Sequence, residues 1–381
     1  MSWSDSRVPA SAGAIADGFE IVGDAFAANF EGGQELGASF AVTLGGQMVI
    51  DIRGGHADRA KETQWTEDTI ACIYSSGKAV LSLLVAREVS NGRLDYDSPV
   101  ADIWPAFGVA GKDQITLAQV LSHQAGLCGF QDEMPPGTWL DWDAITGKLA
   151  EMAPLWPPGS AHGYHPQTVG FIAGELLHRV TGKTFGALVA ELANRHRLNI
   201  FCGVAADQAS RAAFMPKPPK APDLGELNEF TKLAFLKPWS APARVSREAW
   251  MAAELPASNM HADARSLATI VTPFANDGHG PPDGDPFLSP ETIEAALRER
   301  AHGDDLVLPF HLSWSAGLMR NINHHFGPSE HAFGHAGFGG SCVVVDPIKG
   351  LTAAYVMNKM SPFLVGDPRA VRLLDAVYAS L

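Results

Sequence analysis

The β-prone segments of this chain gather near its two ends, and this distribution constrains the fold more than any other feature. Residues 39–44 and 48–52 are short β-prone runs separated by Gly45-Gly46, a pattern typical of a β-hairpin. Strand-like patterns return near the C-terminus, at residues 312–318, 340–346 and 351–356. Because a strand needs a partner for its backbone hydrogen bonds, we expect the two ends to build one sheet layer together.

The middle of the chain has a different character. Residues 130–247 are rich in Pro, Trp and Gly between helical pieces, and they lack the alternation of strands. With 381 residues, the chain exceeds the roughly 250–300 residues at which a single core stops growing. We therefore predict an α/β (α+β) fold. Residues 1–85 and 250–381 would form a discontinuous domain, an antiparallel sheet flanked by helices, and residues 86–249 a mostly helical inserted domain.

Apolar spacing with the period of a helix, together with helix stop signals, marks the expected helices. They cover residues 15–30, 78–90, 115–122, 169–180, 185–194, 263–276 and 369–381.

Charge and hydropathy narrow the possible partners. The chain has 28 Lys and Arg residues against 42 Asp and Glu, a formal net charge of −14 without a dense basic run, so we expect no nucleic-acid partner. No apolar stretch approaches the roughly 18–20 residues that span a bilayer, and residues 1–14 do not resemble a signal peptide. We therefore expect a cytoplasmic protein with no membrane partner, and the oligomeric state stays open.

The cysteines lie far apart and include no C-x-x-C pair, so we expect buried thiols and neither a disulfide framework nor a zinc site. They are Cys72, Cys128, Cys202 and Cys342.

The first candidate for chemistry is the S-x-x-K spacing from Ser75 to Lys78. At positions i and i+3 of a helix both side chains share one face, which brings an amine within reach of a serine hydroxyl. The spacing is common by chance, and the alternative is an N-cap serine followed by a solvated lysine. Ser76 is a poorer nucleophile candidate because its i+3 partner is Ala79.

Several downstream segments strengthen the active-site interpretation. In order, they are Leu121 to Leu127 (LSHQAGL), Pro157-Pro158-Gly159, Tyr164-His165-Pro166, and His335-Ala336-Gly337 followed by a strand. With the S-x-x-K pair, this set resembles the serine β-lactamase and penicillin-binding protein superfamily over nearly the whole chain. The resemblance is to its class C-like branch and to the family VIII carboxylesterases, and it implies a β-lactamase-like fold.

The resemblance implies roles for three side chains. Ser75 matches the acylated serine, and Lys78 matches the lysine that shares or relays its proton. Tyr164 matches the tyrosine of the family's Y-x-N element, which would act as a phenolate or as a hydrogen-bond relay. A Lys78 cation nearby would help by lowering the tyrosine pKa. The alternative for Tyr164 is a core tyrosine with a satisfied hydroxyl.

The resemblance also implies the surroundings of the acyl group. The backbone N–H groups of Ser75 and Phe338 would form the oxyanion hole, and Gly337 would let substrate approach the strand edge. We expect the side chains or backbone of His335, Gly337, His165 and Trp156 to contribute to substrate binding. Packing within the core is the alternative for Trp156, and a packed ring is the alternative for His335.

Two departures from the family pattern bear on the substrate. Pro166 replaces the asparagine of Y-x-N, which removes an amide that would contact a substrate amide. His335 stands where the K-T-G element has its lysine, a group that helps to hold a β-lactam carboxylate. Both changes favour an ester over a β-lactam as substrate.

Other catalytic motifs do not occur in the sequence. There is no G-x-S-x-G, no H-E-x-x-H and no G-x-G-x-x-G, so we expect no metal and no cofactor. The pairs His162 with His165 and His324 with His325 lack matching carboxylates in the sequence, so we favour histidines without a metal.

Together these observations predict a serine carboxylesterase that hydrolyses small, short-chain esters through an acyl-enzyme, with weak or no β-lactamase activity. The small-molecule ester is the expected partner. Two alternatives stay open: a D-amino-acid peptidase, amidase or β-lactamase of the same fold, and a non-catalytic penicillin-binding-like sensor.

Overall fold

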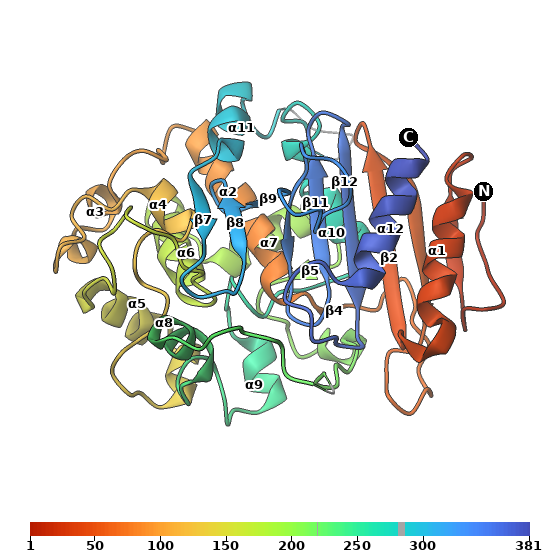
Figure 1. The fold of residues 1–381 in the computed structure, drawn as a ribbon, viewed down its shortest axis with the longest axis horizontal. Coiled ribbons are helices and arrows are strands. Elements are labelled where there is room, and N and C mark those ends of the chain that lie inside the picture. The colour runs from red at the N-terminus through yellow and green to blue at the C-terminus, as the bar shows by residue number, and fades with distance from the viewer. Residues whose placement is uncertain (219, 281–285) are drawn as a thin grey trace.

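The computed structural model describes residues 1–218, 220–280 and 286–381. Within these residues, one large antiparallel sheet of nine strands crosses the molecule (Figure 1). In spatial order its strands are β1 (Ala12–Ile15), β3 (Gln47–Gly55), β2 (Gly37–Leu44), β12 (Leu351–Met357), β11 (Cys342–Asp346), β10 (Phe333–Ala336), β9 (Met319–Arg320), β8 (His311–Trp314) and β7 (Ala301–Asp304).

The pairing of β2 with β12 joins the two ends of the chain in this sheet. Phe40 lies opposite Tyr355, and Val42 lies opposite Ala353, all fully buried. Strand β2 is buried over nearly its whole length because helices cover both of its faces. The expected antiparallel sheet shared by the two ends is therefore confirmed.

Helices cover the sheet on both sides. On one face, α1 (Glu20–Phe30) and α12 (Pro368–Ala379) pack against each other, and both run across the front of the sheet in Figure 1. On the other face, α10 (Ala264–Ile270) contacts β2 and β12. Helix α2 (Lys78–Ser90) runs through the interior and packs on α6 (Thr168–Thr181), so nearly all of its side chains are buried.

Among the described residues from 86 to 249, the regular elements are helices apart from the two-residue strand Ile200–Phe201, and they are joined by long irregular segments. The helices of this region and its surroundings are α3 (Val100–Ile103), α4 (Leu117–Leu121), α5 (Trp142–Glu151), α6, α7 (Phe185–His196), α8 (Glu229–Thr231), α9 (Arg247–Ala252) and α11 (Pro290–Leu297). A π-helical turn, Lys232–Leu236, follows α8 directly. The division of the chain into two domains at residues 85/86 and 249/250 stays a prediction.

A second, small sheet was not predicted. Its strands β4 (Ala71–Cys72), β6 (His261–Ala262) and β5 (Ile200–Phe201) have two residues each, too short for a period to show in the sequence. Strand β4 directly precedes the S-x-x-K segment, and its pairing in this sheet connects that segment to two distant parts of the chain. None of the described helices is long and apolar enough to cross a lipid bilayer.

One helix begins later than its apolar spacing suggests. The helix expected at residues 15–30 starts at Glu20, because Ile15 ends β1 and pairs with Ile50 of β3. Ile15 is buried in either arrangement, so its apolar character could not distinguish a strand end from a helix start.

Candidate active site

Ser75 and Lys78 meet at the start of α2. Ser75 lies in a turn of 3-10 helix, Tyr74–Gly77, and Lys78 is the first residue of α2. Lys78 Nζ lies 2.9 Å from Ser75 Oγ, which is hydrogen-bonding distance. Tyr74, directly before the serine, has φ of +44°, an unfavourable conformation for a residue with a side chain. In this strained turn Ser75 is half-buried, while Lys78 is 2% exposed.

Backbone carbonyls surround the Lys78 amine. Nζ lies 2.9 Å from the carbonyl oxygen of Pro166 and 2.9 Å from that of Ala257. Burial holds the pKa of Lys78 well below its usual value, and among the described residues no carboxylate opposes this shift. Carbonyl oxygens can only accept, so a neutral amine directs its two N–H bonds to them and its lone pair toward Ser75 Oγ. This is the arrangement that a general base requires.

Tyr164 lies on the other side of the amine. Its ring centre is 4.9 Å from Lys78 Nζ, and its ring stacks on Trp314 at 5.8 Å between centroids. Burial raises the pKa of Tyr164, and a hydrogen bond with Ser75 opposes this shift only in part. Lys78 does not lower the tyrosine pKa as we had expected. A neutral phenol fits the relay interpretation and not the phenolate interpretation.

Asp305, which the sequence reasoning missed, holds Tyr164 in place. Its Oδ1 accepts backbone hydrogen bonds from Tyr164 at 3.0 Å and from Val307 and Leu308 at 2.9 Å each. Its Oδ2 lies 3.0 Å from His162 Nδ1. Nothing in the local sequence marks this aspartate as part of the site, because Tyr164 and His162, the partners that bring it there, lie about 140 residues earlier.

His335 is buried in the site as a neutral ring. Its Nδ1 lies 3.0 Å from the carbonyl oxygen of Ala336, so Nδ1 carries the hydrogen. Burial, with a smaller contribution from Lys78, lowers the pKa of His335 to about 3. Its Nε2 is therefore an acceptor, and it has no hydrogen-bond partner among the described residues. The ring cannot supply the positive charge of the lysine that it replaces.

The turn after β10 approaches the serine closely. A Cβ atom on Gly337 would collide with the carbonyl oxygen of Ile73 and with Ser341 Oγ, so only glycine fits. Ser76 Oγ donates to the carbonyl oxygen of His335 at 3.3 Å, which ties the serine turn to β10. The Phe338 ring meets the Tyr74 ring edge-on at 5.6 Å. The structure therefore brings Phe338 beside the Ser75 turn, and the oxyanion role of its N–H stays a proposal.

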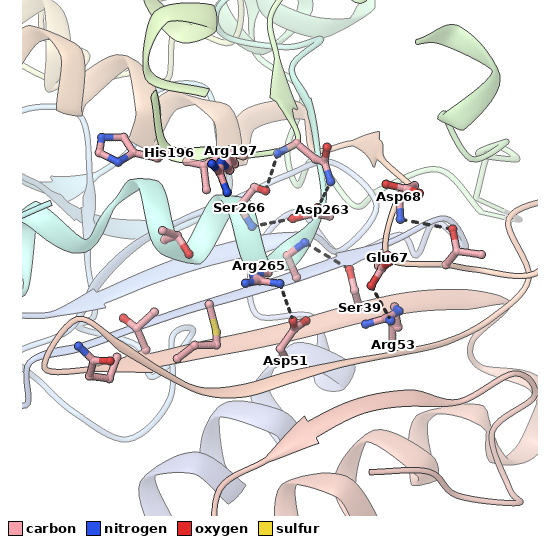
Figure 2. Close-up of a pocket in the computed structure, with 18 of the residues that line it drawn as sticks. Ser39, Asp51, Arg53, Glu67, Asp68, His196, Arg197, Asp263, Arg265 and Ser266 are labelled. Atoms are coloured by element: carbon pink, nitrogen blue, oxygen red, sulfur yellow. Dashed lines mark hydrogen bonds and ion pairs between the residues drawn. The ribbon is translucent and has the colours of Figure 1, made fainter. Parts of the chain in front are cut away.

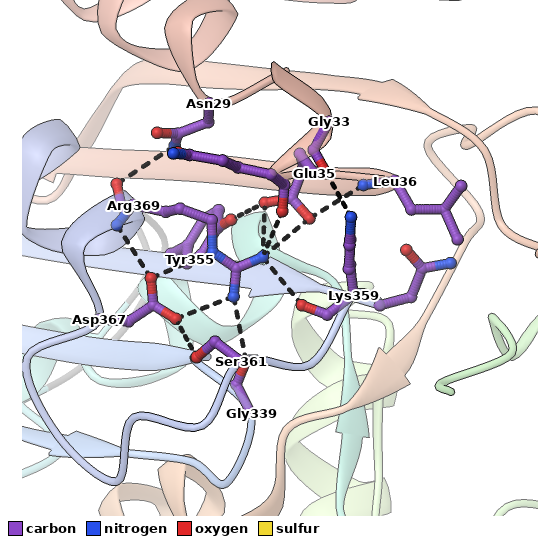
Figure 3. Close-up of polar contacts among 12 residues, drawn as sticks. Asn29, Gly33, Glu35, Leu36, Gly339, Tyr355, Lys359, Ser361, Asp367 and Arg369 are labelled. Atoms are coloured by element: carbon purple, nitrogen blue, oxygen red, sulfur yellow. Dashed lines mark hydrogen bonds and ion pairs between the residues drawn. The ribbon is translucent and has the colours of Figure 1, made fainter. Parts of the chain in front are cut away.

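A buried charge cluster supports this turn from behind, as Figure 3 shows. Arg369, at the start of α12, donates to the carbonyl oxygen of Gly339 at 3.1 Å. The same guanidinium bonds Asp367 at 2.8 Å and Glu35 at 3.2 Å, and the Tyr355 hydroxyl also donates to Glu35. Arg369 is 5% exposed and contacts two carboxylates, so it stays charged. The cluster thus holds the backbone of Gly339, the residue that follows Phe338, in place.

His165 and Trp156 are engaged in packing. His165 Nε2 accepts the N–H of Leu127 at 2.8 Å, and Nδ1 donates to the carbonyl oxygen of Gly163 at 2.6 Å, so both ring nitrogens have partners. Trp156 meets His165 and Phe230 edge-on. Both side chains brace the loop that carries Tyr164. A direct contact of either one with substrate stays a prediction.

Other aromatic rings lie nearer to the nucleophile. Tyr74 and Phe338 are half-buried, Trp250 lies 6.4 Å from the Tyr74 ring, and Phe235 lies 6.5 Å from the Tyr164 ring. Phe235 belongs to the π-helical turn Lys232–Leu236. Aromatic walls of this kind suit an apolar acyl or alkyl group. Among the described residues, no group of three or more His, Cys, Asp or Glu side chains is placed to hold a metal ion.

Comparison with known proteins decides the family. A beta-lactamase family model matches residues 24–376. The chain belongs to the beta-lactamase family. Esterase/beta-lactamase LipL of Mycobacterium tuberculosis is 32% identical over 377 residues, which covers 93% of this chain and 85% of that protein.

Solved structures agree with this family. A penicillin-binding protein homologue from Caulobacter crescentus has a TM-score of 0.94 at 47% identity, covering 97% of this chain and 100% of that one. A family VIII carboxylesterase has a TM-score of 0.90 at 36% identity, with 97% and 100% covered. The resemblance and the fold class predicted from the motifs are confirmed, and this member of the beta-lactamase family is a serine hydrolase.

Proposed function

We propose that the protein is a carboxylesterase that hydrolyses small, short-acyl esters through an acyl-enzyme on Ser75. The observation that carries the proposal is the buried Lys78 amine, 2.9 Å from Ser75 Oγ and 2.9 Å from each of two backbone carbonyls. That geometry leaves a lone pair directed at the serine proton.

The reaction follows from this arrangement. Lys78 takes the Ser75 proton while Oγ bonds to the acyl carbon, and the oxyanion faces the N–H groups of Ser75 and Phe338. The ester C–O bond then breaks, and the leaving alkoxide receives the proton from Lys78 through the Tyr164 hydroxyl. Water attacks the acyl-enzyme, gives its proton to Lys78, and releases the acid as Ser75 recovers its proton.

The surroundings favour an ester over a β-lactam. The neutral His335 ring offers an acceptor where the carboxylate of a β-lactam needs a cation. The half-buried rings of Tyr74, Phe338 and Trp250 suit an uncharged substrate. The likeness to a family VIII carboxylesterase supports the same choice.

The test compares p-nitrophenyl butyrate and nitrocefin hydrolysis by the native protein, Ser75→Ala and the exposed control Ser210→Ala. We expect turnover of the ester far above that of nitrocefin, loss of both in Ser75→Ala, and native activity in Ser210→Ala. Fluorophosphonate should label the native protein and not Ser75→Ala. Ester hydrolysis that survives in Ser75→Ala would overturn the assignment.

The same assay distinguishes the alternatives. Faster hydrolysis of nitrocefin or of D-alanyl p-nitroanilide than of the ester would identify a β-lactamase or a peptidase. No labelling of the native protein by fluorophosphonate would identify a non-catalytic sensor.

A further inference from the structure

A large pocket lies away from the catalytic serine, between the sheet and the helices α7 and α10. Its volume is about 760 Å³, within the range of small-molecule sites. Figure 2 shows Arg197 on the α7 side, Asp51 and Arg53 on the β3 side, and Arg265 of α10 between them. Ser39, Thr43 and Thr269 also line it.

The arginines of this pocket have most of their donors unused. Arg53, Arg195, Arg197 and Arg265 all line it, and each guanidinium has five N–H donors. Arg53 is the most buried, with 19% of its side chain exposed, and it makes one hydrogen bond, to Glu67 at 3.3 Å. Arg265 lies 3.6 Å from Asp51, beyond hydrogen-bonding distance.

The remaining two arginines lie at the end of α7. Neither Arg195 nor Arg197 forms an ion pair with any residue that the structure describes, although Arg195 lies near enough to Glu191 to help lower the pKa of that carboxyl. The four guanidinium groups line this cavity together with four carboxyl groups, those of Asp51, Glu67, Asp68 and Asp263, so an anion would bind through the arginine donors that these carboxylates leave unused.

The carboxylates in the pocket are engaged to different degrees. Asp263 accepts hydrogen bonds from the Ser266 N–H at 2.6 Å and from Asn199 Nδ2 at 3.0 Å, so it is part of the scaffold. Asp51 accepts no hydrogen bond from the described side chains; burial raises its pKa, and the charges of Arg265 and Arg53 oppose this rise. An anionic ligand would compete with Asp51 for these two arginines.

The walls of the pocket continue into the small sheet behind the catalytic turn. Asn199 precedes β5, Asp263 follows β6, and Asp68 leads into β4. Strand β4 leads to Ser75, and the Ile73 N–H donates to the carbonyl oxygen of Met260 at 2.9 Å just before β6. A ligand that joined these three walls would therefore hold the sheet from which the serine turn emerges.

We propose that this pocket binds a small metabolite carrying two or more phosphate or carboxylate groups, with Arg53, Arg265 and Arg197 as its principal donors. Binding steadies the sheet β4-β6-β5 behind Ser75. The site is separate from ester hydrolysis, so it stands or falls independently of the proposed function.

Calorimetric titration at low ionic strength tests the proposal, with sodium pyrophosphate and citrate as probes. We expect saturable binding of at least one of them, and weaker binding as salt is added. The double variant Arg53→Gln/Arg265→Gln should bind at least about tenfold more weakly, because charge-assisted hydrogen bonds are lost. Asp51→Asn should bind more tightly, because it removes the competing carboxylate. Arg298→Gln, an exposed arginine elsewhere, should bind as the native protein does.

The two probes distinguish the source of the oxyanions. Tighter binding of pyrophosphate identifies a phosphate ligand, and tighter binding of citrate identifies a carboxylate ligand. The proposal is overturned if neither probe binds, or if the double arginine variant binds as well as the native protein. Repeating the titration with Ser75→Ala separates this result from any failure of the esterase assignment, since that variant should retain full binding.

Discussion

Two buried basic side chains, Lys78 and Arg369, contact the segments that form the Ser75 site, and their partners differ. Lys78 contacts two backbone carbonyls and a serine hydroxyl, whereas Arg369 contacts the carboxylates of Glu35 and Asp367. Without a carboxylate, burial lowers the pKa of Lys78 and makes its neutral form available. With two carboxylates, Arg369 keeps its charge and holds the carbonyl of Gly339.

The difference shows how one site can contain both a base and a rigid support. A base needs a form that gives up and takes up protons near neutral pH, so a counter-ion would impair it. A support needs a permanent charge with satisfied partners, since a lone buried charge is costly. Changing either residue should therefore produce a different kind of failure.

The largest effect on activity should come from Lys78→Ala. Removal of the base should reduce kcat for p-nitrophenyl butyrate by about 10²–10⁴-fold, the usual contribution of general-base catalysis. The exposed control Lys349→Ala should retain native kcat. A decrease of less than tenfold in the Lys78 variant would show that another group takes the serine proton.

Arg369→Gln should mainly affect stability. It leaves Glu35 and Asp367 buried beside each other without their cation, which should cost about 3–5 kcal/mol in the free energy of unfolding. Urea unfolding of this variant and of Arg298→Gln measures the difference. Arg369→Lys, which retains charge and loses the forked contacts, should recover part of the stability. Unchanged urea midpoints in both Arg369 variants would contradict a supporting role for the cluster.

The pH profile of kcat/KM sharpens the comparison further. Protonation of Lys78 removes its lone pair, so activity should fall as the pH drops through its lowered pKa and should level off above it. Burial raises the pKa of Tyr164, so no alkaline limb should begin at the ordinary tyrosine pKa. A profile measured from about pH 5 to about pH 10 covers both the expected fall in activity at low pH and the ordinary pKa of tyrosine. Activity that rises as the pH is lowered would contradict a neutral lysine base.

Glu35→Gln should have the smallest effect. Burial raises the pKa of Glu35 from its ordinary value of 4.5 to about 7, so the folded state binds its proton more tightly than the unfolded state. The stability contributed by this difference is complete below 4.5 and is lost as the pH rises through 7. Glutamine mimics the protonated acid, so near pH 6 the variant should lie within about 1–2 kcal/mol of the native protein. At higher pH, urea unfolding should show that the free energy of unfolding of the variant rises relative to that of the native protein. A constant difference at every pH would show that Glu35 does not titrate in this range.

Much of the site could be predicted from local sequence. The S-x-x-K spacing placed Ser75 and Lys78 on one helical face, and the structure brings their side chains to 2.9 Å. The glycine at position 337 was expected to allow close approach, and the structure shows no room for a side chain there. Helical and strand periods located most of the long elements, including α2 and β12, because regular burial leaves a regular pattern.

Other features depend on contacts between distant segments. Asp305 reaches Tyr164 about 140 residues away and Arg369 reaches Glu35 about 330 residues away, and no local pattern predicts these contacts. The neutral state of His335 follows from its burial and from the proximity of Lys78, not from the residue type. The sequence by itself thus determined the family, through motifs spread along the chain, and it predicted Ser75 as nucleophile and Lys78 as its partner from their spacing. Only the tertiary structure distinguishes a buried lysine without a counter-ion, which suits a base, from a buried arginine with two carboxylates, which suits a support, because burial and counter-ions are set by segments that meet only in the fold.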